Sequence, residues 1–427
     1  MSTSNNLQVK KGPSPIIIIG ALFFVFGFAT WLNSLLIPYL GIACELTKFQ
    51  SFFVTFAFYI AYLAMAPLST RVLKLFGFKN GMAVALIVMA VGAFLFIPAA
   101  YTRTYALFLL GLFVIGAGLA ILQTASNPYI TIVGPPESAA KRISIMGIFN
   151  KMAGAAAPII LGLFLKLENA DKLKAEVASM TADNRAAALN EMALRVVPPY
   201  IGIIVVLLLL SVFVFKSGLP EVDTDQEDAS LAATNQGKKS VFDFPHIILG
   251  VITLFLYVGV EVIAGDSIIS YGVSQGIPMT ISTYFPTGTM VSMVVGYIIG
   301  IICIPKYIKQ ENALRLCAVL GVVFTLGALA TSSYVSVAFV ALLGLANSLI
   351  WPAIWPLALA GAGRFTKAAS SLLVMGIAGG AIIPLAYGKL ADIYSSHQAY
   401  WITIPCYLFI LYYAVAGHKV GRSKIAD

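Results

Sequence analysis

Long apolar stretches alternate with short polar segments along almost the whole chain. Each stretch has the length, about 20 residues, that an α-helix needs to cross the hydrocarbon core of a bilayer. The stretches are 16–40, 50–73, 80–100, 105–133, 143–165, 199–216, 246–273, 280–304, 313–332, 334–361, 369–390 and 399–418. The pattern predicts an all-α membrane protein with twelve transmembrane helices.

Two polar segments are longer than the others. Residues 166–198 contain amphipathic sequence and predict short helices between the fifth and sixth spans. Residues 217–245 are first acidic and then basic. Six spans on each side of a long polar segment are typical of transporters built from two pseudo-symmetric halves. We therefore expect a six-helix bundle over residues 1–216, a cytoplasmic linker over 217–245 and a second six-helix bundle over 246–427.

The basic residues indicate the orientation of the chain. Most of the 27 Lys and Arg residues fall in alternate polar segments, on the same side as both termini. Because positively charged loops stay on the cytoplasmic side, this predicts cytoplasmic N- and C-termini. We expect a multi-pass protein of a bacterial inner membrane, in contact with the lipid bilayer. The net charge of +9 reflects this orientation, so no nucleic-acid partner is expected.

The composition narrows the classes of function. The chain is 59% hydrophobic and only 11% charged, and its four Cys and three His are scattered without metal-ligand spacing. No HExxH or P-loop motif is present, which argues against a membrane enzyme. We expect no cofactor apart from a coupling ion, and a monomeric protein.

Several segments of the chain match the pattern of one known family, above all ILQTASNPYITIVGP at 121–135. The other segments are WLNSLLIPYL (31–40), IFNKMAG (148–154), LYVGVEV (256–262), TGTMV (287–291) and MGIAGGAIIP (375–384). In these segments the chain resembles the fucose–proton symporter family of the major facilitator superfamily, and QTASNP and ISIMGIFNK are most similar to its glucose/galactose and N-acetylglucosamine branch. The resemblance implies the major facilitator fold, a central cavity and cation-driven import of a monosaccharide, either a hexose or an N-acetylhexosamine.

The chain departs from the fucose members at two positions. Ser34 stands where those members have an Asp, and Gln123 stands where they have a Glu. The resemblance implies that these carboxylates handle the sugar and the proton. Their replacement favours sodium as the coupling cation, and both sodium and a proton stay open.

Ionisable side chains inside the spans are rare. Of the 18 acidic residues, only Glu261 and Asp266 fall inside an expected span, the seventh. A charge at membrane depth is costly unless it faces a cavity or a partner. We therefore interpret both as cation-coupling residues for sodium or a proton, and Glu261 also as a sugar ligand. The alternative is that each carboxylate belongs to a fixed ion pair or lies at a hydrated helix end.

Lys151 is the one basic residue well inside an expected span, the fifth, and Asn150 precedes it. We count Lys151 as a third candidate cation-coupling residue. It either pairs with a carboxylate such as Glu261, donates to sugar hydroxyls, or extends to the cytoplasmic surface. Asn150 is a candidate sugar ligand.

Uncharged polar residues supply the other candidates. Gln123 and Asn127 share a face of the fourth helix, and Asn33 lies in the first. Amides donate and accept hydrogen bonds, which suits vicinal sugar hydroxyls, but buried amides also join helices to each other. Asn127 also precedes Pro128, so a role at a helix kink is the alternative for this residue.

Asn347, Trp351 and Trp355 form one stripe of the tenth helix at intervals of four residues. An aromatic face suits the C–H face of a pyranose, so all three are candidate sugar ligands. Aromatic residues also form belts at the membrane interface, and Trp355 lies near the cytoplasmic end.

These residues favour a cation-coupled importer of a monosaccharide that works by alternating access. An uncoupled sugar facilitator needs no carboxylate at membrane depth, so Glu261 argues against it. A drug or metabolite exporter of the same superfamily favours a cavity of aromatic and Met side chains, so the amides argue against it.

Overall fold

The computed structural model describes residues 15–132, 139–165, 179–219, 238–304, 306–362 and 365–421. Twelve helices in these ranges are long and apolar enough to cross a membrane, which confirms the predicted fold class. The helices of the first set are α1 (Pro15–Trp31), α2 (Asn33–Ala43), α3 (Lys48–Ser51), α4 (Phe53–Thr102), α5 (Tyr105–Ile132), α6 (Ala139–Leu165), α8 (Ala182–Leu194) and α9 (Val197–Lys216).

A second set of helices follows the expected linker. Its members are α11 (Pro245–Asp266), α12 (Ile268–Ser274), α13 (Met279–Ser282), α14 (Phe285–Cys303), α15 (Gln310–Ala330), α16 (Ser333–Asn347), α17 (Ile350–Leu359), α18 (Thr366–Gly376), α19 (Gly379–Ile393) and α20 (Thr403–Val415). Most of the linker, residues 220–237, lies outside the described residues, and so does 166–178 of the other long segment.

Several spans differ in detail from the apolar stretches. The first span is divided at Leu32 between α1 and α2, and the seventh at Ser267 between α11 and α12. The sixth begins earlier than expected, because the amphipathic α8 continues almost directly into α9. Hydropathy detects an apolar run but does not detect a short backbone break inside it, so these breaks were not predicted.

The second and third spans are joined at Gly77. Its φ of 75° lies in the left-handed region, which side chains with a Cβ rarely adopt. The chain therefore reverses its direction here without a separate loop, and α4 covers both spans.

The chain enters the second set through a short 3₁₀-helix, η3 (Val241–Asp243). The backbone N–H groups of Lys239 and Ser240 donate to the Asp243 carboxylate at 2.8 and 2.9 Å. These hydrogen bonds lower the pKa of Asp243, because they favour its charged form.

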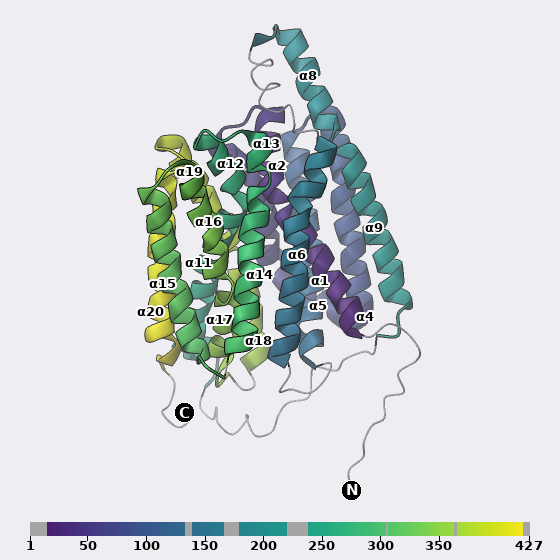
Figure 1. The fold of residues 1–427 in the computed structure, drawn as a ribbon. Coiled ribbons are helices and arrows are strands. Elements are labelled where there is room, and N and C mark those ends of the chain that lie inside the picture. The colour runs from purple at the N-terminus through teal and green to yellow at the C-terminus, as the bar shows by residue number, and fades with distance from the viewer. Residues whose placement is uncertain are drawn as a thin grey trace.

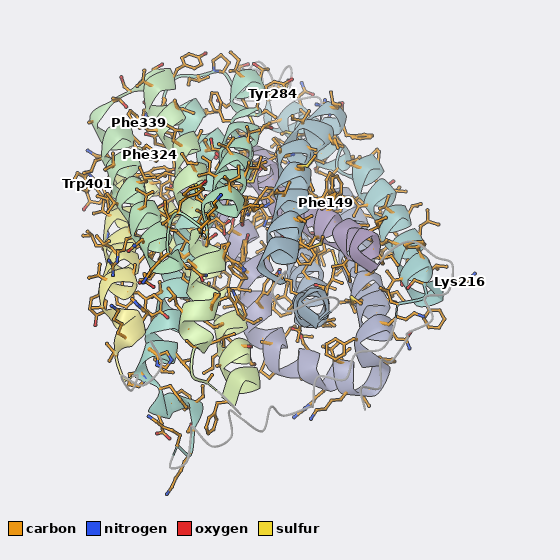
Figure 2. The ribbon with its side chains drawn as sticks, turned by 60° about the horizontal axis from the view of Figure 1, so that its bottom comes forward. Phe149, Lys216, Tyr284, Phe324, Phe339 and Trp401 are labelled. Carbon is orange, nitrogen blue, oxygen red and sulfur yellow. The ribbon has the colours of Figure 1, made fainter. Side chains whose placement is uncertain are left out.

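The bundle has two distinct ends (Figure 1). α1 begins and α20 ends at one of them, here called the terminal end, whereas α3, α8 and α12 lie at the other, here called the α3 end. Large apolar side chains cover much of the outer surface, and Trp401 on its periphery is 56% exposed (Figure 2). An apolar exterior is the surface that a lipid environment requires of a spanning bundle.

The two sets of helices meet along the middle of the molecule. α6 packs against α14, α4 packs against α18 and α19, and α2 packs against α11 and α12. At the α3 end, α3 also packs against α19.

A carboxylate closes this last contact. Asp392 follows Ala391 near the end of α19 and accepts hydrogen bonds from the backbone N–H groups of Lys48 and Phe49 at 3.0 and 2.8 Å. Lys48 Nζ donates in return to the Ala391 carbonyl at 3.3 Å. One side chain of the second set therefore caps the first turn of α3, which belongs to the first set.

We predict that Asp392→Ala loosens the α3 end. Loss of a helix cap costs about 1 kcal/mol, which corresponds to roughly a fivefold rise in the ratio of open to closed molecules. Spin labels at Tyr101 and Tyr394, both exposed at this end, measure the change by double electron–electron resonance once Cys44 and Cys303 are Ser.

Glu191→Gln is the matched control for this experiment. Glu191 pairs with Arg195 inside the first set only, so its substitution leaves the distance distribution unchanged. An Asp392→Ala distribution identical to that of the wild type would show that the cap does not hold the end closed.

Candidate functional site

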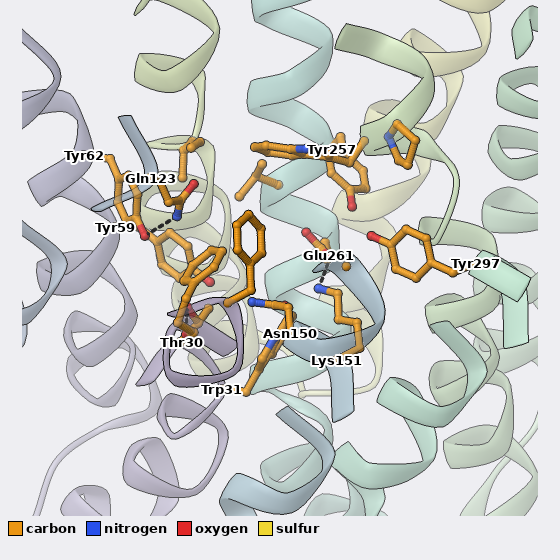
Figure 3. A pocket seen from close by; sticks show the side chains of 17 residues that line it. Thr30, Trp31, Tyr59, Tyr62, Gln123, Asn150, Lys151, Tyr257, Glu261 and Tyr297 are labelled. Carbon is orange, nitrogen blue, oxygen red and sulfur yellow. Dashed lines mark hydrogen bonds and ion pairs between the residues drawn. The ribbon is translucent and has the colours of Figure 1, made fainter. Parts of the chain in front are cut away.

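A central cavity lies between the two sets of helices (Figure 3). Its walls come from α1, α4, α5 and α6 on one side, and from α11, α14, α17 and the break between α18 and α19 on the other. It is lined by Phe23, Phe26, Thr30, Trp31, Tyr59, Tyr62, Gln123, Gly147, Asn150, Lys151, Tyr257, Val258, Glu261, Tyr297, Trp351, Pro352 and Ile377. None of these residues belongs to α2, α3 or α12, so the cavity lies on the terminal side of the closed α3 end.

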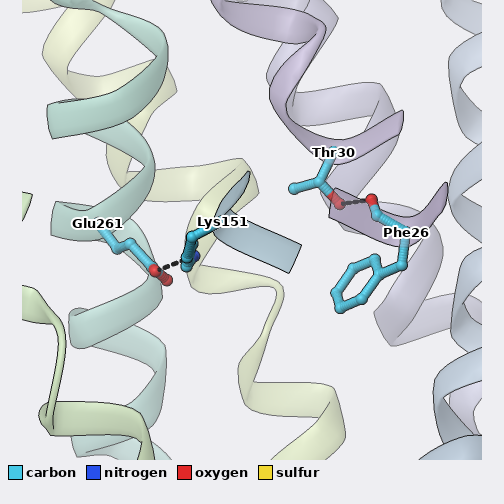
Figure 4. A network of polar contacts seen from close by, with 4 residues as sticks. All are labelled: Phe26, Thr30, Lys151 and Glu261. Carbon is cyan, nitrogen blue, oxygen red and sulfur yellow. Dashed lines mark hydrogen bonds and ion pairs between the residues drawn. The ribbon is translucent and has the colours of Figure 1, made fainter. Parts of the chain in front are cut away.

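Lys151 and Glu261 form an ion pair across the cavity (Figure 4). Lys151 Nζ from α6 donates to Glu261 Oε1 on α11 at 2.8 Å, and the two side chains are 8% and 11% exposed. The alternative in which Lys151 extends to the surface is therefore not what the structure shows. The pair joins the two sets of helices and leaves each charge of the cavity balanced by the other.

Two tyrosines surround this pair. Figure 3 shows the hydroxyl groups of Tyr257 and Tyr297 pointing toward Glu261. Tyr257 lies one helical turn before Glu261 on α11, and Tyr297 belongs to α14. The carboxylate therefore faces one cation and two hydroxyl groups, both of which are able to donate hydrogen bonds.

Trp31 is held between two glycines. A Cβ on Gly154 would lie 2.4 Å from the indole ring, and a Cβ on Gly265 would lie 2.1 Å from it. Only glycine leaves room for the ring at both positions. Lys151 Nζ lies 4.4 Å from the centre of the ring, so the indole also supports the cation of the ion pair.

Several buried polar atoms near the cavity have no hydrogen-bond partner among the described residues. Trp31 Nε1 and Asn150 Nδ2 belong to residues that line the cavity. Both amide atoms of Asn33, at the break between α1 and α2, are also unpaired. Buried donors without partners are costly, so these atoms mark a place where a polar ligand or water belongs.

Aromatic rings and one amide form the remaining walls. Gln123 Nε2 donates to the Tyr62 hydroxyl at 2.8 Å, and Tyr62 stacks on Tyr59 with ring centres 6.1 Å apart. On the opposite wall, the ring centres of Trp351 and Tyr257 are 6.4 Å apart. Flat apolar faces thus alternate with hydrogen-bonding groups around the cavity.

The structure brings Gln123, Asn150, Lys151, Glu261 and Trp351 together in one lining, as the sequence predicts for a common site. It places Asn33, Asp266, Asn347 and Trp355 outside that lining. The side chain of Asn127 lies outside the described residues.

Asn347 and Trp355 do not share the stripe that their spacing predicts. α16 ends at Asn347 and α17 begins at Ile350, so the break changes the face that each residue presents. Asn347 Oδ1 accepts from the Tyr407 hydroxyl at 2.9 Å, which joins α16 to α20. Trp355 packs against Trp351 with ring centres 5.6 Å apart.

The sequence analysis missed most of the aromatic lining. Trp31, Tyr59, Tyr62, Tyr257 and Tyr297 were not singled out, because aromatic residues are common in every span. One signal was present: Tyr257 and Glu261 are four residues apart and so share a helix face. Thr30 was also missed, and its hydroxyl group donates to the Phe26 carbonyl on its own helix at 2.9 Å (Figure 4).

Comparison with known families decides the identity of the fold. The sequence model of the Major Facilitator Superfamily matches residues 19–384. The chain belongs to the major facilitator superfamily. Its relatives in this superfamily are transporters, so the chain is a membrane transporter and not an enzyme.

Two curated relatives specify the branch. The chain is 35% identical to a glucose/galactose transporter of Brucella abortus over 93% of this chain and 92% of the relative. It is 30% identical to the L-fucose-proton symporter of Escherichia coli over 88% and 87%. The predicted resemblance to the fucose–proton symporter family is therefore confirmed.

Solved structures agree with this assignment. A crystal structure of the fucose transporter FucP in the outward conformation has a TM-score of 0.70 at 28% identity and covers 94% of this chain and 97% of its own. The D-xylose-proton symporter, at 13% identity and a TM-score of 0.68, covers 96% and 98% and shows the same fold.

We predict that breaking the ion pair on one side destabilises this transporter. Lys151→Met leaves the Glu261 carboxylate buried without its counter-charge, which costs about 3–5 kcal/mol. Thermal unfolding in detergent measures the loss as a lower midpoint temperature. Glu261→Gln leaves Lys151 uncompensated and gives a loss of similar size.

The double variant Lys151→Met, Glu261→Gln is the decisive comparison. It removes both charges together, so it unfolds at a higher temperature than either single variant. If the midpoint temperature of the double variant fell by the sum of the two single losses, the two charges would not stabilise each other.

Proposed function

We propose that this transporter imports a monosaccharide, a hexose or an N-acetylhexosamine, together with a cation. The observation that carries the proposal is that two residues lining an aromatic-walled cavity, Trp31 and Asn150, have unpaired buried donors, Nε1 and Nδ2. A sugar has hydroxyl groups around its rim and apolar C–H faces. The first match the unpaired donors and the second match the rings.

The charges of the cavity also suit a neutral substrate. Its two charged lining residues, Lys151 and Glu261, already neutralise each other. A strongly charged substrate would leave one of them without balance in a site of low dielectric constant. A neutral polyhydroxy compound instead shares the donors and acceptors of the pair without changing the net charge.

The names of the relatives support this substrate class. One is named a glucose/galactose transporter and another an L-fucose-proton symporter. All these named substrates are neutral monosaccharides. We extend the class, and no individual sugar, to this chain.

The state of the cavity fits one stage of alternating access. In the predicted orientation, the terminal end faces the cytoplasm and the closed α3 end faces the outside of a bacterial inner membrane. The two sets would then rock about the cavity as two six-helix bundles, over residues 1–216 and 246–427, in a monomeric carrier. Opening the α3 end requires separation of Asp392 from α3.

Two alternatives are less well supported. A facilitator needs no ionisable group in its path, and the buried Glu261 and Asp266 are costly features that it would not require. A drug exporter would favour an apolar cavity, whereas Gln123, Asn150 and the ion pair make this one polar.

Uptake into liposomes tests the proposal. Purified protein is reconstituted and offered radiolabelled D-glucose, D-galactose or N-acetylglucosamine, first under a sodium gradient at equal pH and then under a pH gradient without sodium. We expect accumulation of at least one sugar under one gradient. Equilibration without accumulation under both would support the facilitator, and no saturable uptake of any of the three would contradict the proposal.

We predict that Trp31→Phe weakens sugar binding. The substitution keeps an aromatic ring between Gly154 and Gly265 and removes the unpaired indole N–H. Loss of one hydrogen bond to the sugar costs about 1 kcal/mol, or roughly a fivefold rise in the dissociation constant.

Titration calorimetry with the transported sugar measures this effect. Trp401→Phe is the matched control, because Trp401 lies on the outer surface and not in the cavity. Equal affinity of the Trp31→Phe variant and the wild type would remove Trp31 Nε1 from the list of sugar ligands.

A further inference from the structure

Asp266 is an acidic residue that the ion pair of the cavity does not account for. It is the last residue of α11 and is fully buried. Its Oδ2 accepts one long hydrogen bond, from Thr55 Oγ1 at 3.4 Å, and its Oδ1 is buried without a hydrogen-bond partner among the described residues. No described Lys or Arg forms an ion pair with it.

A carboxylate in this environment is poorly stabilised as an anion. A single hydroxyl donor at 3.4 Å is near the limit of a useful hydrogen bond. Lys151 does not provide the missing charge, because it already pairs with Glu261, five residues earlier on α11. An uncompensated second negative charge in the same buried region would be strongly unfavourable. A neutralising ion is therefore required at Asp266.

The neighbours of Asp266 place it directly behind the cavity wall. Gly265, the preceding residue, contacts Trp31, and Tyr59 lies one turn after Thr55 on α4. Trp31 and Tyr59 both line the cavity. Two titratable groups interact electrostatically with Asp266: Glu261 on its own helix and Tyr59 on α4.

We propose that Asp266 is the proton-binding site of this transporter, and that its protonation permits the α3 end to close. The proposal rests on the proposed function and specifies its coupling ion. In this chain the proton-binding carboxyl group would thus belong to the second set of helices, whereas the fucose members carry their carboxyl groups in the first set. The sodium favoured by the sequence departures is then not the coupling ion.

The position of Thr55 explains how binding is linked to the conformational change. Thr55 belongs to the first set and Asp266 to the second, so the contact between them separates when the α3 end opens. Water from that side then delivers one proton to Oδ1. The neutral carboxyl group permits closure, because burying it costs far less than burying an anion. The proton afterwards leaves to water in the cavity, past Trp31 and Tyr59.

The central test compares the wild type with Asp266→Asn in liposomes. Asn has nearly the same shape as a protonated Asp but does not release or bind a proton in this range of pH. We expect the variant to keep sugar exchange between equal concentrations on both sides. We expect accumulation driven by a pH gradient to fall to a ratio near one.

A second readout follows the proton itself. Pyranine trapped inside the liposomes reports the entry of protons when sugar is added outside. The wild type acidifies the interior with sugar, and Asp266→Asn does not. Asp183→Asn, an exposed substitution of the same kind on α8, behaves like the wild type.

Thr55→Val provides an independent measurement that does not remove the carboxyl group. Val has the shape of Thr but no hydroxyl group. The Thr55 hydroxyl donates to the Asp266 carboxylate and favours its ionised form, so the substitution favours the protonated form. The pH at which uptake is half-maximal therefore rises by roughly half a unit. An unchanged pH profile would contradict the assignment, even if Asp266→Asn did not fold.

The outcomes separate two kinds of failure. If the wild type transports none of D-glucose, D-galactose and N-acetylglucosamine, the proposed function itself fails. If the wild type transports a sugar but Asp266→Asn retains both proton entry and accumulation, only the assignment of Asp266 fails. Accumulation driven by a sodium gradient at equal pH, without acidification, would also overturn the proton site.

Discussion

The rest of the site depends on one electrostatic constraint: two opposite charges are buried in a membrane protein at a distance of 2.8 Å. Neither Lys151 nor Glu261 is tolerable alone at this depth, because the medium around them screens charge poorly. Together they cross the boundary between the two sets of helices. The cavity therefore forms around a pair whose geometry must change whenever the two sets move relative to each other.

Close packing around Trp31 makes this geometry specific. Gly154 on α6 and Gly265 on α11 leave space for one indole ring, and that ring supports the Lys151 cation. The breaks at Leu32 and Ser267 lie beside this contact in sequence. Both residues keep backbone angles of the right-handed helical region, so each break interrupts the helix only locally. Such discontinuous helices at matching positions are a common way to build a binding site at membrane depth.

The two buried carboxylates of α11 have different environments although they are five residues apart. Glu261 has a cation, and Asp266 has only the Thr55 hydroxyl group. The first is balanced within the protein, and the second has no counter-charge among the described residues. In the mechanism proposed above, this difference gives one helix both a fixed polar group for a substrate and a variable charge for coupling.

The sequence by itself determined the twelve spans, the superfamily and the scarcity of charge inside the membrane. These follow from local composition, because a bilayer imposes length and polarity on each span separately. Sequence reasoning also identified Gln123, Asn150, Lys151, Glu261 and Trp351, since polar residues and Trp stand out in apolar helices. Only the tertiary structure decided that Lys151 pairs with Glu261, that Asn347 turns toward α20, and that Asp266 lacks a cation. Those facts depend on helix breaks and on contacts between helices far apart in the chain, which a pattern along one helix does not contain.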